Sequence, residues 1–182
     1  YDNFDKFCKR DDIDALIISS PTHTHAEMLP KLIQNNQHIL IEKPLATSIK
    51  DAKMISNLLH NYPGVVWTGM EYRYAPPVSH AINEAHLGTI GQIHMVSIRE
   101  HRHPFLPKVG DWNRFNRNTG GTLVEKCCHF FDLMRYILSS DPVSVFASGS
   151  IGLNHKNERY DKDTMFHYLS NYKQDEIQIF LR

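Results

Sequence analysis

The 182-residue sequence has few cysteines, and neither sign of charge prevails in it. Its three cysteines, Cys8, Cys127 and Cys128, are too few and odd in number for a disulfide framework, so they favour a reducing compartment. Twenty basic residues balance twenty acidic ones, which excludes a general attraction to nucleic acid or to an anionic membrane. The sequence also lacks a membrane-length apolar run and, as given, a signal peptide. We therefore expect a cytoplasmic protein with neither a nucleic-acid nor a membrane partner.

The first part of the sequence alternates the patterns of strands and helices. Short apolar runs at 14–20, 38–42 and 65–70 are typical of buried parallel strands. Apolar residues recur at helical spacing from Thr22 or Thr24 to about residue 36, and again after Ser48, which is a candidate N-cap. This β-α-β-α-β order predicts a parallel sheet with right-handed crossovers over residues 1–74.

The remaining residues, 75–182, predict an α+β domain with a mainly antiparallel sheet. Pro77 begins a helix that ends near Leu87, because Gly88 follows it. The other predicted elements are a strand at 92–101, a helix at 122–138, strands near 143–151, 164–170 and 176–181, and a charged loop at 155–162. The fold class is therefore α/β followed by α+β.

A lysine stands at the end of the second apolar run, in Glu42-Lys43-Pro44. Pro44 cannot donate to a sheet ladder, so it ends the strand and fixes the turn that directs Lys43. Open α/β sheets bind ligands at the carboxyl ends of their strands. Lys43 is therefore a candidate for binding or catalysis, although a surface lysine at a strand end is common.

The helix predicted at 122–138 has two stripes. Its apolar stripe, expected to face a core, consists of Leu123, Cys127, Phe130, Met134 and Ile137. Its polar stripe, at i, i+4, i+7 and i+11, consists of Glu125, His129, Asp132 and Tyr136. A solvated outer face explains such a stripe in most helices. The alternative is an acid/base site, because histidine titrates near neutral pH and a carboxylate one turn away can orient it.

Four sequence blocks resemble the Gfo/Idh/MocA oxidoreductases, and they occur in matching order between about Asp11 and Ile151. They are Ser-Ser-Pro-Thr-His-Thr-His at 19–25, Glu-Lys-Pro at 42–44, Gly-Met-Glu-Tyr-Arg-Tyr at 69–74, and Gly-Gly-x3-Glu-x3-His-x2-Asp at 120–132. The resemblance implies a Rossmann-type dinucleotide-binding sheet followed by a substrate and oligomerisation domain. It also implies that a homo-oligomer transfers hydride between NAD or NADP and a sugar, polyol or related hydroxyl or carbonyl substrate.

The resemblance further implies roles for single residues. Lys43 corresponds to the family's active-site lysine and His129 to its acid/base histidine, while Glu125 stands where many members have aspartate. Lys43, Tyr72 and His129 would contact substrate. Residues expected around the cofactor are Ser20, Pro21, Thr22, His25, Glu42, Lys43, Pro44, Glu71, Arg73 and Trp112. Such a set suits alcohol oxidation, because histidine takes the hydroxyl proton and an ammonium group stabilises the developing alkoxide.

Two departures from the family pattern accompany the resemblance. The nine glycines do not form Gly-x-Gly-x-x-Gly, and Gly88/Gly91 and Gly149/Gly152 reproduce only half of it. We therefore expect the phosphate-binding turn to lie upstream of Tyr1, and the sequence as given to be a fragment that is inactive and binds NAD(P) poorly by itself. In addition, Trp-Asn-Arg replaces the Trp-Arg of some relatives, which leaves a cofactor role for Arg114 open.

Two rival functions compete with the enzyme. The twelve histidines and the Cys127-Cys128-His129 run invite a metal site, but consecutive helical residues lie about 100° apart and cannot all face one ion. His101 and His103 lack an evident third ligand, so we expect no metal. The second rival is a non-catalytic dinucleotide- or sugar-binding protein of the same fold. The presence of both Lys43 and His129 favours the enzyme.

Overall fold

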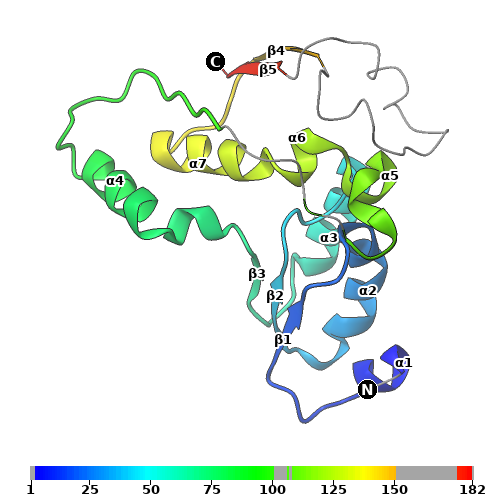
Figure 1. Cartoon of the computed structure of the whole chain (residues 1–182). Helices are drawn as coiled ribbons and strands as arrows, with labels where there is room; N and C mark the ends of the chain where they lie inside the picture. Colours follow the sequence, from blue (N-terminus) through cyan, green and yellow to red (C-terminus); the bar gives the residue numbers. More distant parts are fainter. Residues whose placement is uncertain (1–2, 101–105, 107, 151–175, 182) are drawn as a thin grey trace. The chain divides into compact units, whose positions relative to one another are not determined.

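The computed structural model describes residues 3–100, 106, 108–150 and 176–181 (Figure 1). The chain forms two compact units. Unit 1 comprises Tyr1–Met70 and Arg117–Cys128, and unit 2 comprises Glu71–Asn116 and His129–Arg182. The strand expected near 164–170 and the loop expected at 155–162 lie outside the described residues.

Unit 1 is built on a parallel sheet, as the sequence predicts. Its strands are β1 (Ala15–Ile18), β2 (His38–Ile41) and β3 (Val66–Thr68), in the order β1-β2-β3. Ile18 pairs with Ile41, and Ile41 with Thr68. Its helical segments are α1 (Phe4–Cys8), η1 (Thr22–Thr24), α2 (His25–Leu32), η2 (Ile33–Asn35), α3 (Ile49–Leu59) and α6 (Thr122–Glu125), while α5 (Asn116–Thr119) begins one residue before the second segment of unit 1.

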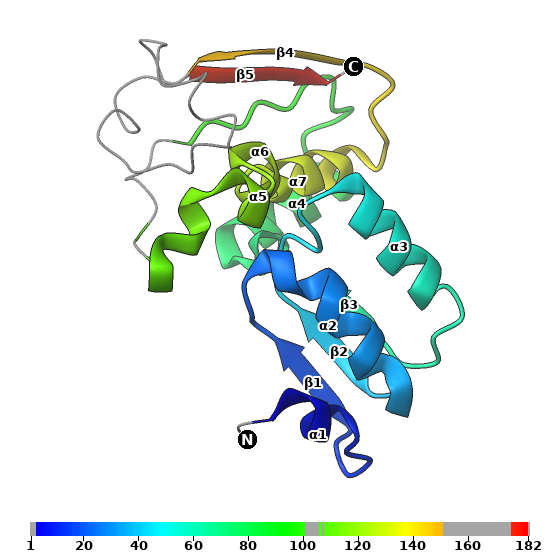
Figure 2. The same cartoon turned by 90° about the vertical axis from the view of Figure 1, so that its right-hand side faces the viewer.

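The core of unit 1 lies on one face of this sheet. Two right-handed crossovers between strands added in the same direction place both connecting helices on the same side, and α2 and α3 cover one face (Figure 2). The buried cluster joins Leu16, Ile18, Ile39 and Ile41 of the strands with Leu29 and Leu32 of α2 and Ile55 of α3.

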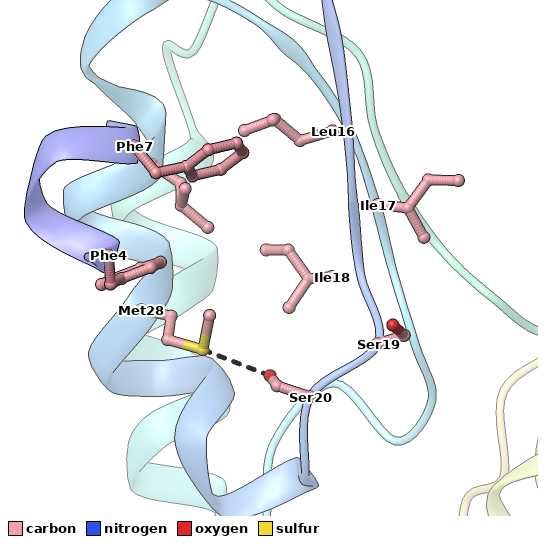
Figure 3. A pocket seen from close by; sticks show the side chains of 9 residues that line it. Phe4, Phe7, Leu16, Ile17, Ile18, Ser19, Ser20 and Met28 are labelled. Carbon is pink, nitrogen blue, oxygen red and sulfur yellow. Dashed lines mark hydrogen bonds between the residues drawn. The ribbon is translucent and has the colours of Figure 1, made fainter. Parts of the chain in front are cut away.

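The opposite face of the sheet is exposed at β1, which differs from the sequence prediction. Apolar runs predict strands buried on both faces, but Ile17 is 74% exposed whereas Leu16 and Ile18 are buried. Figure 3 shows Leu16 and Ile18 directed into a hollow between β1, α1 and α2, and Ile17 directed away from it. The burial of β1 therefore alternates with the two-residue period of a strand.

Unit 2 begins with η3 (Glu71–Tyr74) and α4 (Pro76–His86), whose proline start confirms the predicted helix. It continues with η4 (Val109–Arg114), most of α7 (Cys128–Leu138), β4 (Val145–Ser150) and β5 (Glu176–Leu181). Strands β4 and β5 pair antiparallel, from Val145 with Leu181 to Ser150 with Glu176, as expected. The strand prediction at 92–101 is wrong for its described part, since residues 92–100 have neither helical nor strand structure. Their apolar and polar residues alternate imperfectly, so the two-residue period typical of a strand is weak in this segment.

The helix predicted at 122–138 is interrupted between α6 and α7. The carbonyl of Thr122 accepts from the backbone N–H of Lys126 at 2.9 Å and also from that of Cys127 at 3.1 Å. The hydrogen-bond ladder thus slips from i−4 to i−5 at this point, which breaks the helical repeat. The sequence pattern implied that Glu125 and His129 are neighbours on one continuous helix. The structure places them on two separate helices, α6 and α7.

Candidate functional site

The carboxyl edge of the sheet in unit 1 carries two of the predicted segments. Ser20, Pro21 and Thr22 follow the end of β1, and Glu42-Lys43-Pro44 follows the end of β2. The strands are parallel hydrogen-bonded neighbours, and the N–H of Glu42 still donates to the carbonyl of Ile18 at 2.9 Å. The structure therefore places both segments at one edge, where open α/β sheets bind ligands.

His25 connects the two loops at this edge. Its side chain is fully buried, with Nε2 3.0 Å from the carbonyl oxygen of Ser20 and Nδ1 3.3 Å from that of Leu45. The imidazole thus faces main-chain oxygens on both sides. The hydroxyl of Ser20 also has protein partners, because it accepts from Thr24 Oγ1 at 2.8 Å and lies 3.2 Å from the sulfur of Met28 (Figure 3). These contacts give both side chains a part in shaping the edge.

Lys43 reaches a backbone carbonyl from the second segment of unit 1. Its Nζ donates to the carbonyl oxygen of Glu125 at 3.0 Å. Glu125 is the last residue of α6, where the helix stops. In a continuous helix this carbonyl would serve the N–H four residues later. The interruption after α6 therefore coincides with the bond that fixes the lysine ammonium group.

A glycine allows α6 to approach the loop that follows Lys43. Gly120 has φ +77°, and a Cβ at this position would lie 2.7 Å from the carbonyl oxygen of Thr47 and 2.9 Å from Cβ of Val124. A larger residue is excluded both by its backbone conformation and by lack of space. This close approach explains why residues 117–128 belong to unit 1.

In unit 2, His129 is enclosed by η3. The residue is 1% exposed, and the Tyr72 ring stacks on the imidazole with centroids 4.1 Å apart and planes 8° from parallel. The Glu71 carboxylate oxygen Oε1 lies 3.5 Å from His129 Nε2, and this carboxylate side chain is itself 60% exposed. The predicted acid/base histidine is thus buried, with a solvent-facing carboxylate beside one ring nitrogen.

The neighbouring residue, Arg73, binds the next turn of α7. Its Nε and Nη2 donate to the two carboxylate oxygens of Asp132, each at 2.5 Å. This hydrogen-bonded carboxylate raises the pKa of Arg73 further above its usual value, so the guanidinium group stays charged. The guanidinium carbon also lies 4.4 Å from the centre of the Tyr136 ring, a cation–π contact.

These contacts correct the expected faces of the helix. The solvated interpretation of the polar stripe is wrong for His129, which is buried, and for Asp132, which pairs with Arg73. Within α7 the buried residues are His129 and Leu133, whereas Leu123, expected in the core, is 38% exposed on α6. The physical reason is that η3, more than fifty residues away in the sequence, covers the polar face.

The sequence placed Asp132 and Tyr136 on the polar stripe and indicated that Gly120 allows close backbone approach, but it did not predict the contacts that these residues make. The sequence contained one signal for these contacts, the complementary charge of the two segments. The acid Glu71 contacts the base His129, and the base Arg73 contacts the acid Asp132. Trp112 lies half-buried on η4, in another segment of unit 2.

Among the residues that the structure describes, no group of three or more histidines, cysteines or carboxylates has the geometry of a metal site. Within that same part, no helix has the length and apolarity to cross a membrane.

A parallel β-α-β-α-β sheet with polar segments at its carboxyl edge defines a Rossmann-type domain. Residues 1–70 match the oxidoreductase family with an NAD-binding Rossmann fold, and residues 86–180, just over half of the chain, match the C-terminal α/β domain of the same family. The chain belongs to the Gfo/Idh/MocA oxidoreductase family. The family predicted from the four sequence blocks is thereby confirmed, and so is the fold class predicted from the strand and helix patterns.

Several known proteins are similar to this chain. The NAD(+)-dependent scyllo-inositol 2-dehydrogenase of Bacillus subtilis strain 168 is 30% identical over 159 residues, which cover 86% of this chain and 45% of that protein. A crystal structure from Sinorhizobium meliloti 1021, provisionally assigned as a myo-inositol dehydrogenase, has a TM-score of 0.79 at 25% identity and covers 99% of this chain and 50% of that one. Levoglucosan dehydrogenase with NADH and levoglucosan shares the fold, with a TM-score of 0.76 at 23% identity, covering 100% of this chain and 48% of that one. The chain thus spans less than half the length of the curated relatives it matches.

Proposed function

We propose that the intact protein is an NAD(P)-dependent oxidoreductase that interconverts a hydroxyl and a carbonyl group on a sugar, polyol or related small molecule. The main support for the proposal is the position of Lys43. It lies at the carboxyl edge of the sheet, and its ammonium group donates to the Glu125 carbonyl. Support for the substrate class comes from the inositol and levoglucosan dehydrogenases among the similar proteins.

The donor set at this edge fits a nicotinamide ribose or a substrate hydroxyl. A lysine ammonium group has three N–H donors, and the bond to Glu125 uses one of them. The Glu42 carboxylate is exposed beside it and supplies acceptors for hydroxyl groups. Ser20, Pro21, Thr22, Glu42, Lys43 and Pro44 are therefore the residues we propose for this side of the cofactor. When bound, NAD(P) supplies the acceptor or donor of hydride.

In the proposed reaction, His129 takes the proton of the substrate hydroxyl as the carbonyl forms, and it returns that proton in the reverse direction. Lys43 stabilises the negative charge that develops on the substrate oxygen. Glu125 acts through its main-chain carbonyl, which directs Lys43. The family resemblance is the ground for pairing Lys43 of unit 1 with His129 of unit 2. We also propose that residues 1–74 form the cofactor domain and residues 75–182 the substrate domain.

A spectrophotometric assay of the full-length protein tests the proposal. NADH or NADPH formation is followed with inositols, other polyols and sugars, together with calorimetric measurement of cofactor binding. Turnover of at least one of these substrates supports the enzyme. The alternative, a non-catalytic binding protein of the same fold, predicts tight cofactor or sugar binding with no turnover across the whole panel.

We also propose that the intact protein is a cytoplasmic homo-oligomer. In the part of the chain that the structure describes, the antiparallel pair β4–β5 leaves Val145 and Phe146 of β4 62% and 64% exposed, and two paired strands are marginally stable by themselves. A second copy of the protein that covers this sheet would bury such side chains. Light scattering of the full-length protein should give a mass at least twice that of one chain, and a monomer at micromolar concentration contradicts the assembly.

A further inference from the structure

We propose that Glu71, Tyr72 and Arg73 form a clamp that fixes the imidazole of His129, and that they are positioning residues for this histidine and not ligands of the cofactor. The part that concerns catalysis rests on the function proposed above. The clamp itself rests on contacts within unit 2, where three consecutive residues each contact α7.

Tyr72 fixes the plane of the imidazole ring. The two rings lie 4.1 Å apart and only 8° from parallel, and Tyr72 also contacts Phe130 with ring centroids 6.4 Å apart. Rotation of the imidazole about its bond to Cβ would break this stack. Because His129 is 1% exposed, solvent offers no compensating contacts to a rotated ring.

Glu71 places its carboxylate beside one ring nitrogen of His129. Its carboxylate lies 3.5 Å from Nε2 and only accepts hydrogen bonds, so it favours a proton on that nitrogen. Hydrogen bonds at catalytic histidines are often long before substrate binds and shorten in the complex. The same carboxylate stabilises the positive charge that the ring acquires when it takes a second proton.

Arg73 anchors the clamp to the helix. It binds both oxygens of Asp132, which follows His129 by three residues and so lies on the same face of α7. The bidentate geometry restricts rotation as well as distance. A role for Arg73 in binding a cofactor phosphate would require this pair to break, so the geometry favours an anchor over a phosphate ligand.

Nuclear magnetic resonance of ¹⁵N-histidine in the full-length protein tests the clamp without depending on turnover. The His129 ring signals are assigned by their loss in His129→Gln. In Tyr72→Leu we expect these signals to shift or broaden, while the conservative Tyr72→Phe, which keeps an aromatic ring, retains them. We also expect kcat to fall by roughly 10–100-fold in Tyr72→Leu, with the KM for NAD(P) within about twofold of the unmodified protein.

Each result has a definite meaning for the clamp. Unchanged His129 signals and kcat in Tyr72→Leu would overturn it, and so would a raised KM for NAD(P) at constant kcat, which identifies a cofactor ligand. If Tyr72→Leu does not fold, Arg73→Lys tests the anchor, and the same change in the His129 signals is expected. If the unmodified protein shows no turnover but Arg73→Lys, which leaves the Tyr72 ring in place, alters the His129 signals, the proposed function fails and the clamp stands.

Discussion

Lys43 bonds to a neutral acceptor, the main-chain carbonyl of Glu125. Its ammonium group donates to a main-chain carbonyl at 3.0 Å, so this bond directs the charge without cancelling it. A directed cation is what a developing alkoxide requires. His129 is held by side chains, whereas Lys43 is held by a main-chain carbonyl. The buried imidazole contacts Glu71 and Tyr72, which are consecutive residues of η3. At the scale of residues, the proposed chemistry depends on these local partners as much as on the two side chains.

Replacing Lys43 by methionine tests its charge. Lys43→Met keeps most of the side-chain length and removes the ammonium group, so we expect kcat to fall by roughly 10²–10⁴-fold. Steady-state kinetics measure the loss, and an unchanged thermal midpoint is the control for folding. Turnover within a few-fold of the unmodified enzyme would show that the ammonium group has no part in the reaction.

Replacing Glu71 by glutamine removes a charge from the side of His129 but keeps the size of the side chain. Because this carboxylate is 60% exposed, solvent screens much of its effect, and we expect kcat to fall only by about 3–10-fold. The matched variant Glu71→Asp keeps the charge at a longer distance and should lose less. A larger loss in Glu71→Asp than in Glu71→Gln would contradict a role based on charge.

At the scale of elements, α6 and the loop after β2 form one support for Lys43. The helix ends at Glu125 because Thr122 takes two N–H groups, and the Glu125 carbonyl meets the lysine. Gly120 makes this possible by its close contact with Thr47. On the other unit, Arg73 and Asp132 join η3 to α7. Each proposed catalytic residue thus depends on a short helical segment held by a few polar contacts.

Gly120→Ala should weaken the first support. The new Cβ would meet the Thr47 carbonyl oxygen at 2.7 Å in a backbone conformation with φ +77°, so we expect about 2–4 kcal/mol of destabilisation. Gly88→Ala is the matched control, because Gly88 has φ +78° and a methyl group at this position would have nothing within 4 Å. It should cost only about 1–2 kcal/mol in denaturant unfolding. Equal losses in the two variants would show that the contact with Thr47 contributes nothing.

A double-mutant cycle measures the contact between η3 and α7. Arg73→Met, Asp132→Asn and the double variant should give a coupling free energy of about 1–2 kcal/mol, because the pair is bidentate but partly exposed. Urea unfolding provides the values. A coupling near zero would mean that the two side chains do not anchor η3 to α7.

The elements differ in how far the sequence could predict them. The strands of unit 1 follow from their apolar runs, and the edge at Lys43 follows from Pro44 and the parallel order. The end of α6 could not be predicted, because the residues around Glu125 suit a helix and its partner Lys43 lies 82 positions away. The burial of His129 was equally hidden, since the covering segment at Glu71 is remote in the sequence. Local patterns predict elements, whereas remote contacts determine which of their faces are buried.

At the scale of the whole molecule, the chain passes between its two units at residues 70, 116 and 128. Lys43 and Glu125 belong to unit 1, while Glu71, Tyr72 and His129 belong to unit 2. The four sequence blocks that predicted the family are distributed over both units, which is why their order carried more weight than any one of them. The proposed activity belongs to the full-length protein, since the chain spans less than half the length of its curated relatives.

The His129→Ala variant of the full-length protein tests the central claim most directly. Its kcat should fall by roughly 10²–10⁴-fold, because the base is lost, while its Kd for NAD(P), measured by calorimetry, should stay within about threefold. A parallel Lys43→Ala variant should lose turnover to a similar extent. Near-normal turnover in His129→Ala would contradict the assignment of this buried histidine as the acid/base residue.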